Sequence, residues 1–148
     1  MTKEIKIKGT ARAILTHDDG RVEVIEDHNM IVNGGFDLLI SSLIKSSNRP
    51  NPLTHIAVGR GTTAAAAGQT ALANEAYRKA GTWSWTTGTK VFTITATWSR
   101  GAVTGTITEG AVFNASSGGT MFDRIVFSTP FTGAADIQYT QQFEFEVA

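Results

Sequence analysis

The stretch 137–147, IQYTQQFEFEV, decides the fold class of this chain. Its larger apolar side chains stand at every second position, together with one glutamine: Ile137, Tyr139, Gln141, Phe143, Phe145 and Val147. The positions between them are polar: Gln138, Thr140, Gln142, Glu144 and Glu146. Successive side chains of a β-strand point to opposite faces, so this alternation predicts a strand with one buried and one solvated face.

The same two-residue period recurs along most of the chain. Strands are expected over residues 3–15, 21–26, 53–59, 90–99, 104–113, 120–127 and 137–147. The pair Asp19-Gly20 predicts a tight turn between the first two strands, because glycine accepts the positive φ that such hairpins need. A β-bulge is expected at Glu109-Gly110, where the alternation is interrupted. Residues 114–120, NASSGGT, are expected to form a loop.

Residues 33–46 have a different period. Their apolar side chains recur at helical spacing: Phe36, Leu39, Ile40, Leu43 and Ile44. This stripe predicts one amphipathic helix. We expect Asn33 to cap its N-terminus, Asp37 to lie in its first turn and Lys45 to lie near its C-terminal end. The asparagines and prolines of 48–52 then predict an irregular connection.

Strands joined by short turns, with a single helix, predict a mainly β fold. The expected architecture is an antiparallel β-sandwich, jelly-roll or immunoglobulin-like, with one short α-helix. The 148 residues are enough for one domain with a hydrophobic core. No linker or internal repeat divides the sequence, so a single domain is expected over residues 1–148.

The composition disfavours several classes of function. The formal net charge is +0 and no basic block occurs, so we expect no nucleic-acid partner. The chain has no cysteine, which excludes disulfides, thiolate metal sites and cysteine nucleophiles. The longest apolar run, FDLLISSLIK at 36–45, is too short to span a bilayer, so no membrane partner is expected. Low charge favours association with other protein surfaces.

The segment 55–75, HIAVGRGTTAAAAGQTALANE, poses the question of a phosphate-binding loop. Gly59 and Gly61 follow a predicted strand, as the glycines of such loops do. However, no lysine follows in the register of a P-loop, and no third glycine completes a dinucleotide fingerprint. We therefore interpret the segment as a loop over a sheet edge, held in place by Leu72.

Residues that could carry other chemistry lack the required spacing. His17, His28 and His55 are not spaced as metal ligands. Glu109 and Asp123 could form an acid–base pair, but nothing in the sequence places them opposite each other. Carboxylates at strand ends are usually solvated, and this is what we expect of both. The sequence thus predicts no catalytic residue, no metal and no cofactor, and the chain is not expected to be an enzyme.

Trp83 and Trp85 leave one alternative open. They share a face of a strand, and exposed tryptophans stack on sugar rings. The alternative function is therefore a carbohydrate-binding or host-surface-binding β-sandwich module. A sandwich of this size also needs bulky aromatic residues to fill its core, and packing in the core or at an interface is the favoured role for both.

Three motifs in order resemble a widespread group of small structural proteins of tailed bacteriophages and prophages. They are NMIVNGGFDLLISSL at 29–43, THIAVGRGTTAAAAGQTALANE at 54–75 and GTITEGAVFNASSGGTMFDRIVF at 105–127. The resemblance covers nearly the whole chain and brings no catalytic residues with it. It implies a non-enzymatic virion protein, made in the host bacterial cytoplasm, that decorates the head or belongs to the tail or baseplate.

The resemblance also implies the partners. They are expected to be copies of the chain itself and other virion proteins, such as major capsid or tail proteins. We expect the contacts to involve loops such as 59–75 and 114–120. The candidate contact residues are Arg60, Gly61, Thr62, Asn74 and Glu75.

Overall fold

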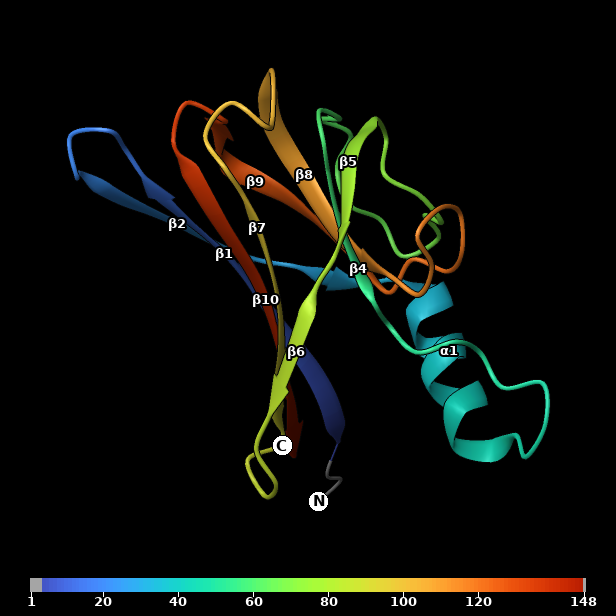
Figure 1. Cartoon of the computed structure of the whole chain (residues 1–148). Helices are drawn as coiled ribbons and strands as arrows, with labels where there is room; N and C mark the ends of the chain where they lie inside the picture. Colours follow the sequence, from blue (N-terminus) through green and yellow to red (C-terminus); the bar gives the residue numbers. More distant parts are fainter. Residues whose placement is uncertain (1–3, 148) are drawn as a thin grey trace.

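Two five-stranded antiparallel sheets face each other, and one helix stands beside them (Figure 1). The structure is a computed structural model that describes residues 4–147. Its elements are β1 (Ile5–Thr16), β2 (Val22–His28), β3 (Met30–Ile31), α1 (Asn33–Ile44), β4 (His55–Gly59), β5 (Glu75–Ala80), β6 (Thr82–Trp85), β7 (Val91–Trp98), β8 (Thr106–Phe113), β9 (Asp123–Thr132) and β10 (Asp136–Val147). The predicted class, mainly β with two antiparallel sheets and one short helix, is confirmed.

The first sheet has the order β2-β1-β10-β7-β6, with β10 as its central strand. β10 pairs with β1 along its whole length, from Ile5↔Val147 to Thr16↔Asp136. Its predicted alternation is confirmed as far as Phe143, with odd-numbered side chains buried. Beyond that point Phe145 is half-buried and Val147 is exposed, so the end of this strand projects past the covering sheet.

The second sheet has the order β3-β9-β8-β4-β5, and the main hydrophobic core lies between it and the first sheet. Aromatic pairs cross this core from β10 to the facing sheet. Phe143 meets Phe122 edge-on at 5.1 Å between ring centroids, and Tyr139 meets Phe127 at 5.8 Å. Such pairs stabilise a core by about 0.5–1.5 kcal/mol beyond the area they bury.

The outer face of the second sheet is also covered, by the loop 60–74 and by the chain around α1. A second apolar cluster fills this layer: Val32, Ala57, Leu72, Ala111, Phe113 and Met121. Leu72 is buried there, as predicted for the residue that holds the loop. β8 therefore has protein on both faces and is buried from Ile107 to Phe113. The bulge predicted at Glu109-Gly110 lies one step earlier, between Ile107 and Glu109.

The helix is confirmed, ending two residues before the predicted boundary, but its capping differs from the prediction. Val32 is the N-cap and Asn33 is already helical, with no side-chain hydrogen bond at the cap. The first turn contains no acidic residue, so Asp37 lies deeper in the helix, and Lys45 is the C-cap. Near its start the helix approaches the chain just before β9 closely, which explains the glycine at position 35. A Cβ at Gly35 would overlap the backbone carbonyl of Phe122.

Within residues 4–147, no helix has the length and apolar character needed to cross a membrane. Lys3, the first residue of the strand expected over 3–15, lies outside the described residues.

Candidate functional site

Glu109 and Arg124 form an ion pair that is wholly buried beneath the loop 60–74. Their side chains have no exposed surface, and Arg124 Nη2 lies 2.9 Å from Glu109 Oε1. β8 and β9 supply one residue each, so the pair ties adjacent strands together. The expectation that Glu109 is a solvated strand-end carboxylate is wrong. It assumed that one face of this strand met water, whereas the loop covers that face.

Three backbone N–H groups of the loop donate hydrogen bonds to the Glu109 carboxylate. They belong to Gly61, Ala73 and Asn74, at 2.8, 2.9 and 2.8 Å. Burial on its own would raise the pKa of Glu109, but the hydrogen bonds from Asn74, Arg124 and the other donors lower it below its ordinary value. The carboxylate therefore stays charged and holds the two ends of the loop side by side.

Arg124 reaches the middle of the same loop. Its Nη1 donates to the carbonyl oxygen of Thr63 at 2.6 Å and to Oε1 of Gln69 at 3.1 Å. Gln69 in turn accepts from the N–H of Ala66 and donates to the carbonyl of Ala64. The loop is thus closed on itself around one buried guanidinium, and no phosphate or other ligand is needed to order it.

The predicted contact residues all lie at the ends of this loop. Gly61 is buried, and its N–H binds Glu109. Thr62 and Asn74 are exposed. Arg60 is exposed, donates to the carbonyl of Thr104 at 3.2 Å and lies over the ring of Tyr77. Glu75 accepts two hydrogen bonds from Arg78. The charged members of the set therefore already have partners within the chain.

Arg78, which sequence reasoning did not select, anchors the other predicted contact loop, 114–120. Its guanidinium lies 3.7 Å from the centroid of the Phe113 ring and donates to the carbonyls of Ala115 and Gly118. Its side chain is only 8% exposed. Both loops are consequently held by buried arginines, and their shapes are set by this chain alone.

A second buried carboxylate, Asp123, lies between the sheets. It accepts hydrogen bonds from the N–H of Val112 at 2.9 Å and from Nδ2 of Asn29 at 2.5 Å. Burial raises its pKa to about 7, against these hydrogen bonds, because no cation is among the partners it has in residues 4–147. Asp123 was also expected to be solvated, and that expectation is wrong. It and Glu109 have separate partners and do not form an acid–base pair.

The buried polar side chains beside Asp123 explain the one glutamine on the inner face of the last strand. The amide of Gln141 lies 2.9 Å from the hydroxyl of Tyr139 and next to the Asp123 carboxylate. Burial and the nearby carboxylate raise the pKa of Tyr139 well above its ordinary value. This cluster helps to fix how β10 packs against β9 of the facing sheet, since each polar group in it needs its partner.

Trp83 and Trp85 do not form a two-ring platform. Trp83 is half-buried, donates from Nε1 to the carbonyl of Leu53 at 2.5 Å and packs 5.5 Å from Phe92. Trp85, at the end of β6, is 68% exposed. Packing is therefore the role of Trp83, and one exposed ring remains for contact with another molecule.

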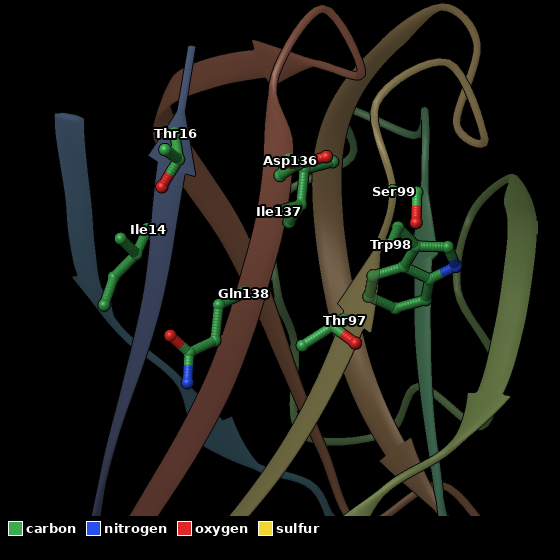
Figure 2. Close-up of a pocket in the computed structure, with 8 residues that line it drawn as sticks. All are labelled: Ile14, Thr16, Thr97, Trp98, Ser99, Asp136, Ile137 and Gln138. Carbon is green, nitrogen blue, oxygen red and sulfur yellow. The ribbon is translucent and has the colours of Figure 1, made fainter. Parts of the chain in front are cut away.

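A polar hollow of about 470 Å³ lies on the outer face of the first sheet (Figure 2). Hydroxyl, amide and carboxylate groups from three strands point into it, among them Thr16, Thr97, Gln138 and Asp136. The Asp136 carboxylate accepts a hydrogen bond from the N–H of Arg100 at 2.7 Å, which indicates a role in the turn. Among residues 4–147, no cluster of three His, Cys, Asp or Glu side chains could hold a metal ion.

A further surface feature is apolar and is here called the apolar end. It comprises a groove, lined mainly by Ile5, Ile7, Phe36, Leu39 and Phe145, and the exposed side chains next to it, Ile40, Leu43, Ile44 and Val147. The groove has a volume of about 450 Å³. The helical stripe was predicted from the sequence, but most of it faces away from the core.

Comparison with protein-family models, with curated proteins and with solved structures finds no match. The features available for assigning a function are therefore the two loops held by buried arginines, the polar hollow and the apolar end. Of these, only the apolar end exposes groups that folding normally buries.

Proposed function

We propose that this chain is a non-enzymatic structural protein of a bacteriophage virion, a head-decoration (cement) protein or a component of the tail or baseplate. It acts through contacts with copies of itself and with capsid or tail proteins, after synthesis in the host bacterial cytoplasm. The observation that carries the proposal is the apolar end, a surface that a protein acting alone would bury.

The exposure of individual side chains supports a contact role. Leu43 and Ile44 are 77% and 75% exposed, and Ile5, on the neighbouring strand end, is 77% exposed. Scattered apolar residues are normal on protein surfaces, but Ile5 lines the groove, and Leu43 and Ile44 belong to the helix that forms its other side. Contiguous patches of this kind mark sites of interaction with other molecules.

The three motifs that resemble phage structural proteins support the proposal in a second way. They pack against one another in the structure. Glu109 of the third motif holds Gly61 and Asn74 of the second, and Asp123 of the third holds Asn29 of the first. Residues from all three motifs also form the outer apolar cluster. The shared residues thus build a rigid scaffold with ordered surface loops, which is what a repeated assembly unit requires.

The proposal is tested on particles produced from the genome that encodes the chain. Particles are purified on a density gradient and their proteins quantified by mass spectrometry. We expect the chain to be present at a fixed number of copies per particle, and antibody against it to label either heads or tails in electron micrographs. Its absence from intact particles, with the chain remaining in the soluble lysate, would contradict the proposal.

A further inference from the structure

The apolar end exists because the two sheets differ in length. β1 and β10 each have 12 residues, whereas β8 and β9 in the second sheet have eight and ten. In Figure 1 the lower parts of β1, β6 and β10 extend past the second sheet, and α1 stands to one side of them. The inward-facing side chains of these strand ends therefore have no sheet opposite them.

The apolar end has two parts of opposite shape. The groove lies between the strand ends and the near side of α1, where Ile5 and Phe145 face Phe36 and Leu39. The ridge is the remainder of the helical stripe, with Leu43 and Ile44 at the C-terminal end of α1. A surface that carries both a groove and a ridge can pair with an identical surface, as a two-fold contact requires.

We infer that the apolar end seats a second copy of this chain, with the α1 ridge of each copy lying in the groove of the other. This inference rests on the proposed function and names the partner at its contact surface. In a two-fold pair the contact between ridge and groove occurs twice, once in each direction. The apolar ends of both copies are therefore covered. It leaves the loops 60–74 and 114–120 outside the pair, where they remain accessible to other virion proteins.

The exposed area is sufficient for such a pair. The large apolar side chains at this end that are at least half exposed are Ile5, Ile40, Leu43, Ile44 and Val147. Together with the lining of the groove, they amount to an area on the order of the ~800 Å² that each partner buries in a standard interface. The centre of the patch is aliphatic and aromatic, as the buried centres of homodimer interfaces are.

The charges around the apolar end do not oppose a second copy. Lys6 pairs with Glu4 at 3.3 Å, and Lys8 pairs with Glu146 at 3.7 Å, so the rim consists of opposite charges already matched within the chain. The formal net charge of the whole chain is +0. Two copies therefore approach without long-range repulsion, and a strongly charged partner would gain nothing at this rim.

The first test is the mass of the purified chain in solution, measured by light scattering during size-exclusion chromatography. We expect twice the mass of one chain at micromolar concentration. The double substitution Leu43→Glu and Ile44→Glu should raise the dissociation constant by at least about 100-fold, since residues at the centre of an interface dominate its affinity. Circular dichroism should show an unchanged fold, because both side chains are exposed in the single chain.

The matched control is the double substitution Val22→Glu and Val24→Glu. These valines are each 57% exposed but lie on β2, at the opposite end of the first sheet from α1 (Figure 1). We expect this variant to keep the mass of the wild-type chain. If it loses the pairing as fully as the helix variant, added charge alone explains the effect and the assignment of the ridge is wrong.

Cysteine cross-linking tests the two-fold geometry. Because the chain has no native cysteine, only the introduced thiols react. Two single-cysteine variants, Ile5→Cys and Leu43→Cys, are purified separately, mixed and treated with a short bismaleimide linker. We expect cross-linked pairs containing one chain of each variant, and fewer such pairs when Val24→Cys replaces Leu43→Cys. Equal yields from the two mixtures would overturn the two-fold arrangement.

A wild-type chain that stays monomeric up to about 100 μM would overturn the inference of a second copy, because an interface of standard size holds well below that concentration. The proposed function would still be decided separately, by the presence or absence of the chain in purified particles. A chain that pairs in solution but is absent from particles would support the second copy and contradict the virion role.

Discussion

The loop 60–74 and the helix α1 are the two large connections that cover or flank the second sheet, and they are held in different ways. The loop has only one apolar side chain larger than alanine, Leu72, yet its ends and its middle are fixed by Glu109 and Arg124 beneath it. The helix is rich in apolar side chains, yet Leu43 and Ile44 touch little of their own chain. The loop is therefore held within one chain, whereas the C-terminal end of the helix is left exposed by its own chain.

The largest effect on folding stability is expected when the buried ion pair beneath the loop is removed. Arg124→Met leaves the Glu109 carboxylate buried without its charged partner, and breaking such a pair costs about 3–5 kcal/mol. We expect a loss of this size in the free energy of unfolding, measured with urea. Adding Glu109→Gln should recover part of it, because the unpaired charge is then gone. A loss below about 1 kcal/mol for Arg124→Met would mean that the pair does not hold the loop.

The second buried carboxylate predicts a pH dependence of stability. The pKa of Asp123 in the folded chain is about 7, above the ordinary value of 3.8, so the folded state binds more protons than the unfolded state between these pH values. The contribution of Asp123 to stability is therefore fully present below pH 3.8 and is lost as the pH rises through about 7, with a fall on the order of 3 kcal/mol between pH 4 and pH 7.

The variant Asp123→Asn isolates this effect, because an amide cannot ionise. Urea unfolding of both proteins between pH 4 and pH 8 should show the variant gaining stability relative to wild type as the pH rises. A difference between the two proteins that stays constant over this range would show that Asp123 does not titrate with the raised pKa.

The helix start offers a pair of neighbouring substitutions with opposite expected effects. Gly35→Ala places a methyl group against the Phe122 carbonyl, so the helix must shift, at a cost of about 1–3 kcal/mol. Gly34→Ala places it at ordinary contact distance, 3.5 Å from Met121 and Thr120. We expect no loss at Gly34, and a gain of up to about 1 kcal/mol from the better helix propensity of alanine. Thermal unfolding would contradict this packing if both variants lost equal stability.

The smallest effects on stability are expected at the exposed residues of the two regions. Arg60→Glu in the loop and Leu43→Glu in the helix should each change the free energy of unfolding by about 0.5 kcal/mol or less. Both variants should be incorporated into particles less efficiently than the wild-type chain. We expect Leu43→Glu to disrupt assembly more strongly than Arg60→Glu, which should weaken incorporation. If Arg60→Glu were incorporated normally, the loop end would not be a contact.

Much of the fold could be predicted because alternation depends on neighbouring residues alone. The strand 137–147 and the helix over 33–44 have periods that are visible in the sequence. The burial of Glu109 could not be predicted in this way, since the groups that hold it come from residues 35 to 48 positions earlier. The period of the helix likewise shows an apolar stripe but not whether the rest of the chain covers it.

The candidate site likewise contains some residues that could be selected from the sequence and others that could not. The second motif contains the residues Gly61 and Asn74 selected from the sequence, but the structure shows that they bind through backbone N–H groups, which any residue type possesses. Arg78 and Arg124 are the side chains that fix the loops, and neither has a local pattern that distinguishes it from a solvated arginine. The helical part of the apolar end could be predicted from the sequence as an apolar stripe. Its exposure is seen only in the structure, where the strands of the first sheet extend past the second sheet (Figure 1).

Hydrogen exchange of the backbone amides, followed by mass spectrometry, tests the contrast between loop and helix most directly. Peptides covering 33–44 and 60–74 are compared between the dilute chain and the paired chain at high concentration in solution. We expect exchange in 33–44 to slow by about tenfold or more on assembly, while 60–74 changes little because it is already held within the chain. Unchanged exchange in 33–44, with slowing confined to 60–74, would contradict the account and place the contact on the loop.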